Sequence, residues 1–338
     1  MPKNKKSFRL AHISDTHIRN LKYHDDYRAV FEQMYSILRV EKPDYIVHCG
    51  DVAHTKTQLS PEFFEMAVDF FDSLSDIAPL VLIAGNHDGN LKNSSRQDAL
   101  TPVIKALGKD TIHYLKNSGE FSPCKGLTFN VLSVFDRDNW VEPSSEKSIN
   151  IALYHGAIAG VETDIGWVMD HGEDDVGIFE GHDFAFLGDI HKTNQILDTE
   201  GRVRYCGSTV QQNFGETNDK GFLIWDIKDK DTFDVRHFVL ENPRPFITIE
   251  LTKTGRLPKA ANPPEGARLR IVTNHPLPIE KVRKAIDVTK TKFKPESVTF
   301  LNRATGSRSK VNLDEDFEKY NLRDIAVQEQ LITEYLQD

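Results

Sequence analysis

Short apolar runs alternate with helical patterns along the first 135 residues. Strands are expected at residues 8–13, 45–49 and 80–84, and helices at 25–40, 61–74 and 96–107. Ser60 and Pro61 form a typical N-cap and first-turn pair for the second helix. Strands that alternate with helices build parallel sheets covered by helices, so this succession limits the chain to the α/β class.

From residue 126 onward the predicted strands follow one another more closely. They span 127–134, 149–154, 184–187, 194–197, 203–206, 222–227 and 232–239, and they indicate a second sheet. Two prolines within residues 241–245 mark a linker. Beyond it, strands at 246–251, 269–272 and 297–301 and a helix at 279–292 form a small β–β–α–β unit. We therefore expect a core domain at 1–242, a small α+β domain at 246–303, and a joint with a final helix at 304–338.

Charge is distributed unevenly along the chain, although the net charge is only −9. Residues 246–310 hold 14 basic and 5 acidic residues, whereas the blocks on either side are acidic. This pattern excludes a uniformly basic coat for nucleic acid and fits either a basic module attached to an acidic catalytic domain or a plain solvated surface. Three cysteines without a Cys-x-x-Cys pair argue against a disulfide framework. No apolar run approaches the roughly 20 residues of a membrane span, so we expect a cytoplasmic protein.

Residue types that bind metals follow five of the predicted strands, at the point where each strand ends. They are Asp15 and His17, then Asp51, then Asn86, His87 and Asp88, then His155, and finally Asp189 and His191. Ligands of open α/β sheets bind at the carboxyl ends of the strands, so we expect these side chains to converge. A single aspartate at a strand end is usually a turn or helix-cap residue. Five strand ends that all carry oxygen or nitrogen ligands favour a common metal site over five independent turn residues.

The chemistry of this set indicates hard or borderline cations. Carboxylates, an amide and imidazoles without thiolate suit manganese, iron, magnesium or zinc. Two ions need at least one bridging ligand, and Asp51 is the natural candidate. A pair of cations can bind one phosphate and lower the pKa of a bound water, so the pattern predicts hydrolysis of a phosphate ester.

The succession of Asp15-x-His17, Gly50-Asp51, Gly85–Asp88, His155 and Gly188–His191 resembles the calcineurin-like metallophosphoesterase superfamily over residues 8–240. Within it, residues 50–54, 205–209, 213–216 and 220–222 are similar to the SbcD-type repair nucleases. The shortness of the segment after the small domain resembles phage-encoded recombination nucleases. The resemblance implies a four-layer α/β sandwich of two mixed sheets flanked by helices, with a small α+β cap domain. It also implies a DNA exonuclease or endonuclease that serves double-strand-break repair and recombination with two divalent ions, manganese first and magnesium as the alternative.

The resemblance also implies roles for individual residues. The first ion would be held by Asp15, His17, Asp51 and His191, and the second by Asp51, Asn86, His155 and Asp189. His87 would face the scissile phosphate, with Asp88 orienting its imidazole, and His54 would help to place the DNA strand. The chain departs from the family at Asp189, because the usual motif is Gly-His-x-His. A carboxylate there should favour hard cations.

Further partners follow from the basic block and the chain end. DNA contacts are expected at Arg268, Arg270, Lys281, Arg283 and Lys284, because phosphate contacts by such residues are independent of sequence. The final helix, at 322–336, has an apolar stripe of Leu322, Ile325, Ile332 and Leu336. In the family, a C-terminal segment binds an SMC-like ATPase of the SbcC type, so we expect this stripe to be a partner site; a helix folded back onto the cap is the alternative. A homodimer through helix 25–40 is also expected.

Two other functions remain open on these residues. One is a phosphatase or small-molecule phosphodiesterase on the same core, and the other is a non-enzymatic scaffold for the ATPase. The intact ligand set argues against the scaffold, and His54 with the basic block argues against the small substrate. Trp140 and Trp167 lie in loops beside the predicted site. A packing role is favoured for both over stacking on a base.

Overall fold

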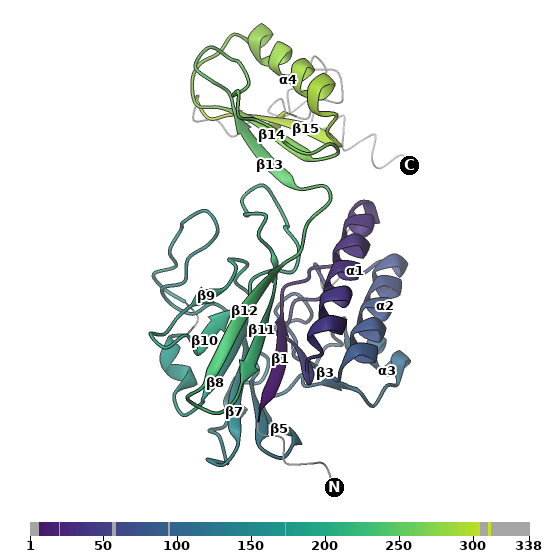
Figure 1. Cartoon of the computed structure of the whole chain (residues 1–338), viewed down its shortest axis with the longest axis vertical. Helices are drawn as coiled ribbons and strands as arrows, with labels where there is room; N and C mark the ends of the chain where they lie inside the picture. The colour runs from purple at the N-terminus through teal and green to yellow at the C-terminus, as the bar shows by residue number, and fades with distance from the viewer. Residues whose placement is uncertain are drawn as a thin grey trace. The chain divides into compact units, whose positions relative to one another are not determined.

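The computed structural model describes residues 7–19, 21–55, 59–93, 95–172, 174–304 and 310–311. The chain divides into two compact units, Met1–Pro243 and Arg244–Asp338 (Figure 1). Within the described residues, no helix has the length and apolar character needed to cross a membrane. The predicted helix at 322–336, with Leu322, Ile325, Ile332 and Leu336, lies outside the described residues.

The first unit begins with a six-stranded sheet in the order β12-β11-β1-β2-β3-β4. Its strands are β1 (Phe8–Ile13), β2 (Tyr45–His48), β3 (Leu80–Leu82), β4 (Ile112–Tyr114), β11 (Gly221–Ile227) and β12 (Phe233–Val239). Strands β1 to β4 run parallel, as the alternation of strands and helices predicts for the first three, whereas β4 was not expected. Strand β11 runs antiparallel to β1 and to β12. The sheet is therefore mixed.

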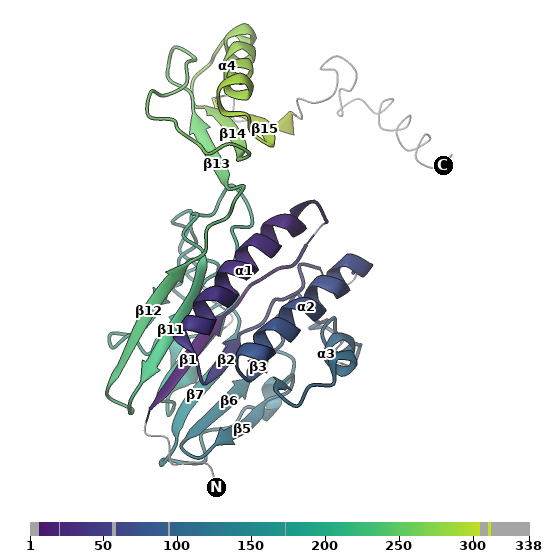
Figure 2. The ribbon, with the colours of Figure 1, turned by 45° about the vertical axis from the view of Figure 1, so that its right-hand side comes forward.

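Three helices cover one face of this sheet, namely α1 (His24–Glu41), α2 (Pro61–Ile77) and α3 (Thr101–Leu107) (Figure 2). Ser60 caps α2 as predicted, because its side chain accepts the Phe63 N–H at 3.2 Å. The rings of Phe31 in α1 and Phe70 in α2 lie 4.4 Å apart and pack in the same core as Ile46 of the sheet. Helix burial against the sheet thus follows the apolar periodicity of the sequence.

The second sheet has the order β5-β6-β7-β8-β10-β9. Its strands are β5 (Gly119–Cys124), β6 (Leu127–Leu132), β7 (Ile149–His155), β8 (Phe184–Gly188), β9 (Gln195–Ile196) and β10 (Val203–Tyr205). One core joins the two sheets, with Leu10 and Val47 from the first and Phe129, Ile151 and Phe186 from the second. The short helix η3 (Val176–Phe179) contributes Phe179 to the core on the other side. The predicted sandwich of two mixed sheets with helices is confirmed.

Two expectations about the first unit were wrong. The strands predicted at 222–227 and 232–239 extend the first sheet instead of joining the second, because β11 pairs with β1 far away in the sequence. The helix predicted at 96–107 begins only at Thr101. Asp98 explains the delay, since its carboxylate accepts the N–H groups of Leu100 and Thr101 at 3.0 and 2.7 Å and so holds a capping turn.

The second unit has the β–β–α–β succession that the sequence predicts. Its elements are β13 (Phe246–Glu250), β14 (Arg268–Thr273), α4 (Ile279–Phe293) and β15 (Ser297–Asn302), with a two-residue strand β16 (Lys310–Val311) at the edge. Val282 and Ile286 of α4 share a core with Leu269 and Ile271 of β14. Lys281 of α4 is exposed and lies among the basic residues counted above.

Candidate metal centre

The polar residues at the strand ends converge in the first unit. Strands β1, β2 and β3 of one sheet and β7 and β8 of the other all point their carboxyl ends to this region. The convergence brings together residues as far apart in the sequence as Asp15 and His191. The fold therefore brings these side chains together, and groups of possible metal ligands meet at Asp51.

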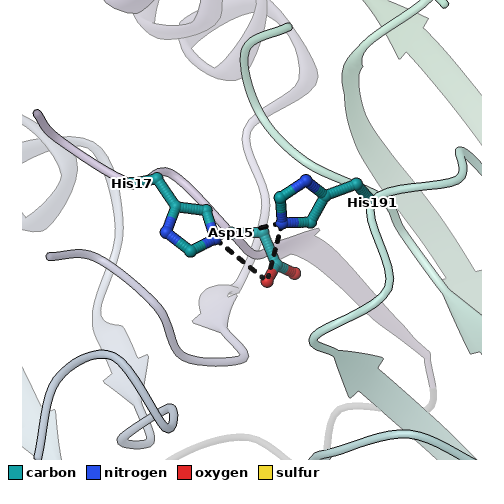
Figure 3. A group of neighbouring side chains, drawn as sticks. All are labelled: Asp15, His17 and His191. Atoms are coloured by element: carbon teal, nitrogen blue, oxygen red, sulfur yellow. Dashed lines mark hydrogen bonds and ion pairs between the residues drawn. The ribbon is translucent and has the colours of Figure 1, made fainter. Parts of the chain in front are cut away.

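The first group contains Asp15, His17 and His191 (Figure 3). The Nε2 atoms of the two histidines lie 3.0 Å apart. Oδ1 of Asp15 lies 3.8 Å from Nε2 of His17 and 3.9 Å from Nε2 of His191. Asp51 joins this group through Oδ2, which lies 3.5 Å from Nε2 of His17. Four ligand atoms thus surround one small space.

The second group lies on the other side of Asp51. Nε2 of His155 is 3.3 Å from Oδ1 of Asp51 and 3.7 Å from Oδ1 of Asp189. The side-chain amide of Asn86 donates to the same Asp189 oxygen at 2.9 Å. The aspartate that replaces the family's usual histidine therefore points into the site.

The backbone around these ligands is strained. Asp15, His17, Asp51 and Asp189 have φ angles of 51°, 47°, 59° and 96°, a region that residues other than glycine rarely adopt. Hydrogen bonds offset part of this strain, because the two carboxylate oxygens of Asp15 accept the Asp189 N–H at 3.1 and 3.0 Å. Such strain persists where surrounding contacts fix it, and it clusters at functional sites.

Gly85 explains how Asp51 fits beside the third strand. A Cβ atom at this position would lie 2.2 Å from Oδ1 of Asp51 and 2.7 Å from Cε1 of His155. Contacts this short do not occur, so only glycine allows the loop after β3 to approach Asp51 so closely. The same Asp51 oxygen accepts the His87 N–H at 2.8 Å.

Burial and charge shift the pKa values of these groups in opposite directions. Burial raises the pKa of Asp15 to about 6. Burial opposes ionisation of Asp51 as well, but the nearby His155 and His17 lower its pKa below the usual value. Burial lowers the pKa of His155, yet the Asp51 carboxylate outweighs it and raises this pKa well above the usual value. The buried acids therefore need positive charge beside them.

The donor set fits divalent cations. Nδ1 of His155 lies 2.7 Å from the Cys49 carbonyl oxygen, and Nδ1 of His191 lies 2.9 Å from Oε1 of Glu216. Because these oxygens only accept, both Nδ1 atoms carry the proton and both Nε2 lone pairs face carboxylates. Without a cation, a second proton on the imidazole offsets the charge of these carboxylates. For His191, burial lowers the pKa, but Glu216 outweighs burial and raises this pKa to about 9. A metal ion can take the place of this proton.

His87 and His54 lie at the mouth of the site. The His87 ring centroid is 4.9 Å from that of His17, and its Nδ1 lies 2.7 Å from the His54 carbonyl oxygen. The His54 ring stacks beside it with a centroid separation of 6.2 Å. His87 donates from Nδ1, and it also forms a cluster with His17 and Asp51 that could hold a metal ion.

Asp88 has a different role from the predicted one. Its carboxylate accepts the N–H groups of Asp51 and Gly85, both at 2.9 Å, and of Ala53 at 2.8 Å. Asp88 therefore fixes the backbone around Asp51, and the His54 carbonyl orients the His87 imidazole instead. The family resemblance implied that the two neighbours pair, but their side chains have different partners.

Sequence reasoning gave no role to three further residues of the site. Glu216 accepts a hydrogen bond from Nδ1–H of His191, and Arg19 and Gln212 line the cleft of about 200 Å³ above the ligands. Glu216 belongs to the run 213–216 that resembles the nuclease branch, so a signal was present without a role. Arg19 and Gln212 had no signal, because only the fold brings them beside the strand ends.

The basic residues of the second unit differ in exposure. Arg268 is buried, lies 2.7 Å from Oε2 of Glu296 and donates to the Arg244 carbonyl oxygen at 2.8 Å. Its charge is used inside the unit, so the expected DNA contact at Arg268 is wrong. Arg270 is half-buried. The three α4 residues are exposed, namely Lys281, Arg283 and Lys284.

Comparison with known proteins identifies the family. The model of the calcineurin-like phosphoesterases matches residues 8–193, which hold all the ligands described above. The chain belongs to the calcineurin-like phosphoesterases. Its two mixed six-stranded sheets and its Asp and His cluster are those of a metal-dependent phosphoesterase.

Several relatives of this phosphoesterase are found among curated proteins. It is 38% identical over 65% of its length to the uncharacterized protein R555 of Acanthamoeba polyphaga mimivirus, of which the match covers 17%. It is 24% identical over 63% of its length to the DNA double-strand break repair protein Mre11 of Methanopyrus kandleri, of which the match covers 51%. It is 23% identical over 67% of its length to one subunit of the nuclease SbcCD of Staphylococcus saprophyticus, of which the match covers 67%. The phosphoesterase thus matches a sixth of the viral relative and half of the archaeal one.

Proposed function

We propose that the chain is a DNA nuclease that uses two divalent cations, with manganese as the first candidate and magnesium as the second. The observation that carries the proposal is the pair of ligand groups that share Asp51, one around Asp15 and one around Asp189. Two cations held in this way supply charge to a phosphodiester and lower the pKa of an attacking water. The proposed ligands are Asp15, His17, Asp51, Asn86, His155, Asp189 and His191.

The chain's own residues would prepare the phosphodiester for attack. Asp51 holds both halves of the site in register, and Asp88 fixes the backbone on which it sits. His87, oriented by the His54 carbonyl, would present Nε2 to the phosphate and stabilise its charge or protonate the leaving oxygen. His54, stacked beside it, would help to place the DNA strand.

Support for DNA as the substrate comes from two sides. The archaeal relative Mre11 is described as a DNA double-strand break repair protein, and the staphylococcal relative as part of the nuclease SbcCD. The exposed α4 residues Lys281, Arg283 and Lys284 would contact phosphates without regard to sequence. We extend the proposal to the second unit as a DNA-facing cap, and to an SMC-like ATPase and a second copy of the chain as partners.

The test is manganese-dependent degradation of end-labelled duplex DNA by the purified chain. We expect His87→Ala to abolish cleavage and His54→Ala to lose mainly exonuclease products. His171→Ala is the matched control, because His171 is exposed and lies outside the ligand groups. It should cleave as the parent chain does.

Three outcomes contradict the proposal in different ways. Hydrolysis of a small phosphodiester without any cleavage of DNA, even with the ATPase present, would favour the small-molecule phosphodiesterase. Failure to bind manganese in calorimetry would favour the scaffold. Full activity of His87→Ala would remove the role assigned to that residue.

A further inference from the structure

A loop at residues 161–169 lies beside the metal ligands and exposes two large apolar side chains. Ile165 is 74% exposed and Trp167 is 59% exposed. Both line a cavity of about 320 Å³ whose other walls include Asp189 and His191. An exposed tryptophan at the edge of a polar site is unusual, because apolar groups of this size are normally buried.

The other two tryptophans are accounted for by packing. Trp225 is fully buried. Trp140 is half-buried, donates Nε1–H to the Ser133 carbonyl oxygen at 2.9 Å and packs edge-on against Tyr154. The packing expected for Trp140 is thus found, whereas for Trp167 it was wrong. Trp167 is left with a face that a ligand can cover.

The loop is firmly anchored at its base. The Thr163 N–H donates to the Trp167 carbonyl oxygen at 2.9 Å, and the Met169 N–H donates to that of Val161 at 2.8 Å. The side-chain oxygen of Gln195 accepts the Glu162 N–H at 2.8 Å and so connects the loop to β9. These bonds fix the backbone on both sides of the tryptophan.

A buried ion pair joins the loop to the ligand loop itself. Nζ of Lys220 lies 2.7 Å from Oδ2 of Asp164, and both side chains are almost fully buried. The same ammonium group donates to the His191 carbonyl oxygen at 2.7 Å. Asp164, three residues before Trp167, is therefore linked through Lys220 to the proposed ligand His191. This link fixes the loop at a constant distance from the site.

We propose that Trp167, with Ile165 beside it, is the stacking platform for a nucleobase of the nucleotide next to the scissile phosphate. The inference rests on the proposed function and names how that site takes its substrate. Every base has a flat π face, so stacking accepts any sequence, which suits a nuclease. Lys192 and Asn213 line the same cavity and offer polar contacts at its rim.

The test compares three dinucleotides, each with one phosphodiester bond, in the presence of manganese. They are thymidylyl-thymidine and the two analogues in which the 5′ or the 3′ nucleoside lacks its base. We expect the parent chain to prefer the complete dinucleotide over one analogue by about 5- to 100-fold in kcat/KM, mostly through KM. Trp167→Ala should bring this preference close to one, and Trp167→Phe should retain most of it.

Val168→Ala is the matched control, since Val168 is exposed on the same loop but does not line the cavity. It should keep the parent preference. A parent chain without base preference, or a Trp167→Ala variant that retains the preference, would overturn the inference.

A second measurement separates this inference from the proposed function. The duplex-DNA assay decides the nuclease proposal on its own. If the parent chain cleaves none of the dinucleotides, binding of thymidine 5′-monophosphate is followed by tryptophan fluorescence. The platform is supported if thymidine 5′-monophosphate quenches the fluorescence of the parent chain but not that of Trp167→Phe, and if 2-deoxyribose 5-phosphate, which lacks the base, does not quench it. No quenching in the parent chain refutes it.

Discussion

Replacing Gly85 by alanine should disable the metal centre. Gly85 does not have a left-handed φ angle, so alanine is compatible with its backbone. The new Cβ atom, however, would lie 2.2 Å from Oδ1 of Asp51, whereas ordinary contacts begin at 3.4 Å. The carboxylate and the loop must therefore separate by about 1.2 Å. Because Asp51 belongs to both ligand groups, both are disturbed together.

The magnitude follows from this displacement. A misplacement of about 1 Å at a reacting site costs on the order of 100-fold in rate. We therefore expect Gly85→Ala to lower kcat/KM for a phosphodiester by at least about 100-fold. Manganese titrated by calorimetry should show weaker binding at both sites.

Gly89→Ala is the control for this experiment, four residues further along the same loop. Its Cβ would lie 2.9 and 3.0 Å from ring atoms of Phe135, a side chain that can move, and at an ordinary 3.6 Å from Cβ of Asp98. Circular dichroism and thermal unfolding check that both variants fold. If Gly85→Ala folds and binds two manganese ions as the parent does, the close approach to Asp51 is not what holds the site. If it does not fold, Asp51→Asn with the same titration decides.

Three further outcomes are expected. Glu216→Ala removes the acceptor for Nδ1 of His191 and should weaken manganese binding by about 10- to 100-fold in calorimetry; unchanged affinity would exclude this positioning role. Ser60→Ala removes the cap of α2 and should lower the free energy of unfolding by about 1 kcal/mol in urea. Although burial favours the neutral form, Lys116 lowers the pKa of Asp98 below 3.8. The ionised carboxylate therefore stabilises the fold above that pH and loses this effect as the pH falls through its lower folded-state pKa, so Asp98→Asn should flatten the acid side of the pH–Tm curve.

The sequence predicts local features of this chain well and distant pairings poorly. The strands before Asp15, Asp51 and His155 are apolar runs that need no partner to be recognised, and the ligands follow them directly. The family resemblance then adds which ligands belong together. The side chains converge because a parallel sheet brings its strand ends to one edge. Which of them share an ion stays a prediction.

The errors arise where a contact crosses many residues. Strand β11 has the composition of any central strand, and nothing in it says that β1 is its neighbour. The orientation of Asp88 depends on three backbone groups from two loops. Trp167 differs from Trp140 only in what surrounds it, which is a property of the folded chain. In each case the deciding partner lies outside the local sequence.

The pairing of β1 with β11 also determines which parts of the first sheet can form first while the chain is being synthesised. Phe8 pairs with Ile227, whereas the last of the ligands is His191. A nascent chain therefore carries its complete ligand set before the strand that closes the first sheet has left the ribosome. Until then one edge of β1 presents unpaired N–H and C=O groups, as would a fragment that ends at residue 193. The segment that holds the ligands is thus shorter than the segment that completes the first sheet, and the strand edge left open between the two stages is a place for aggregation or chaperone binding.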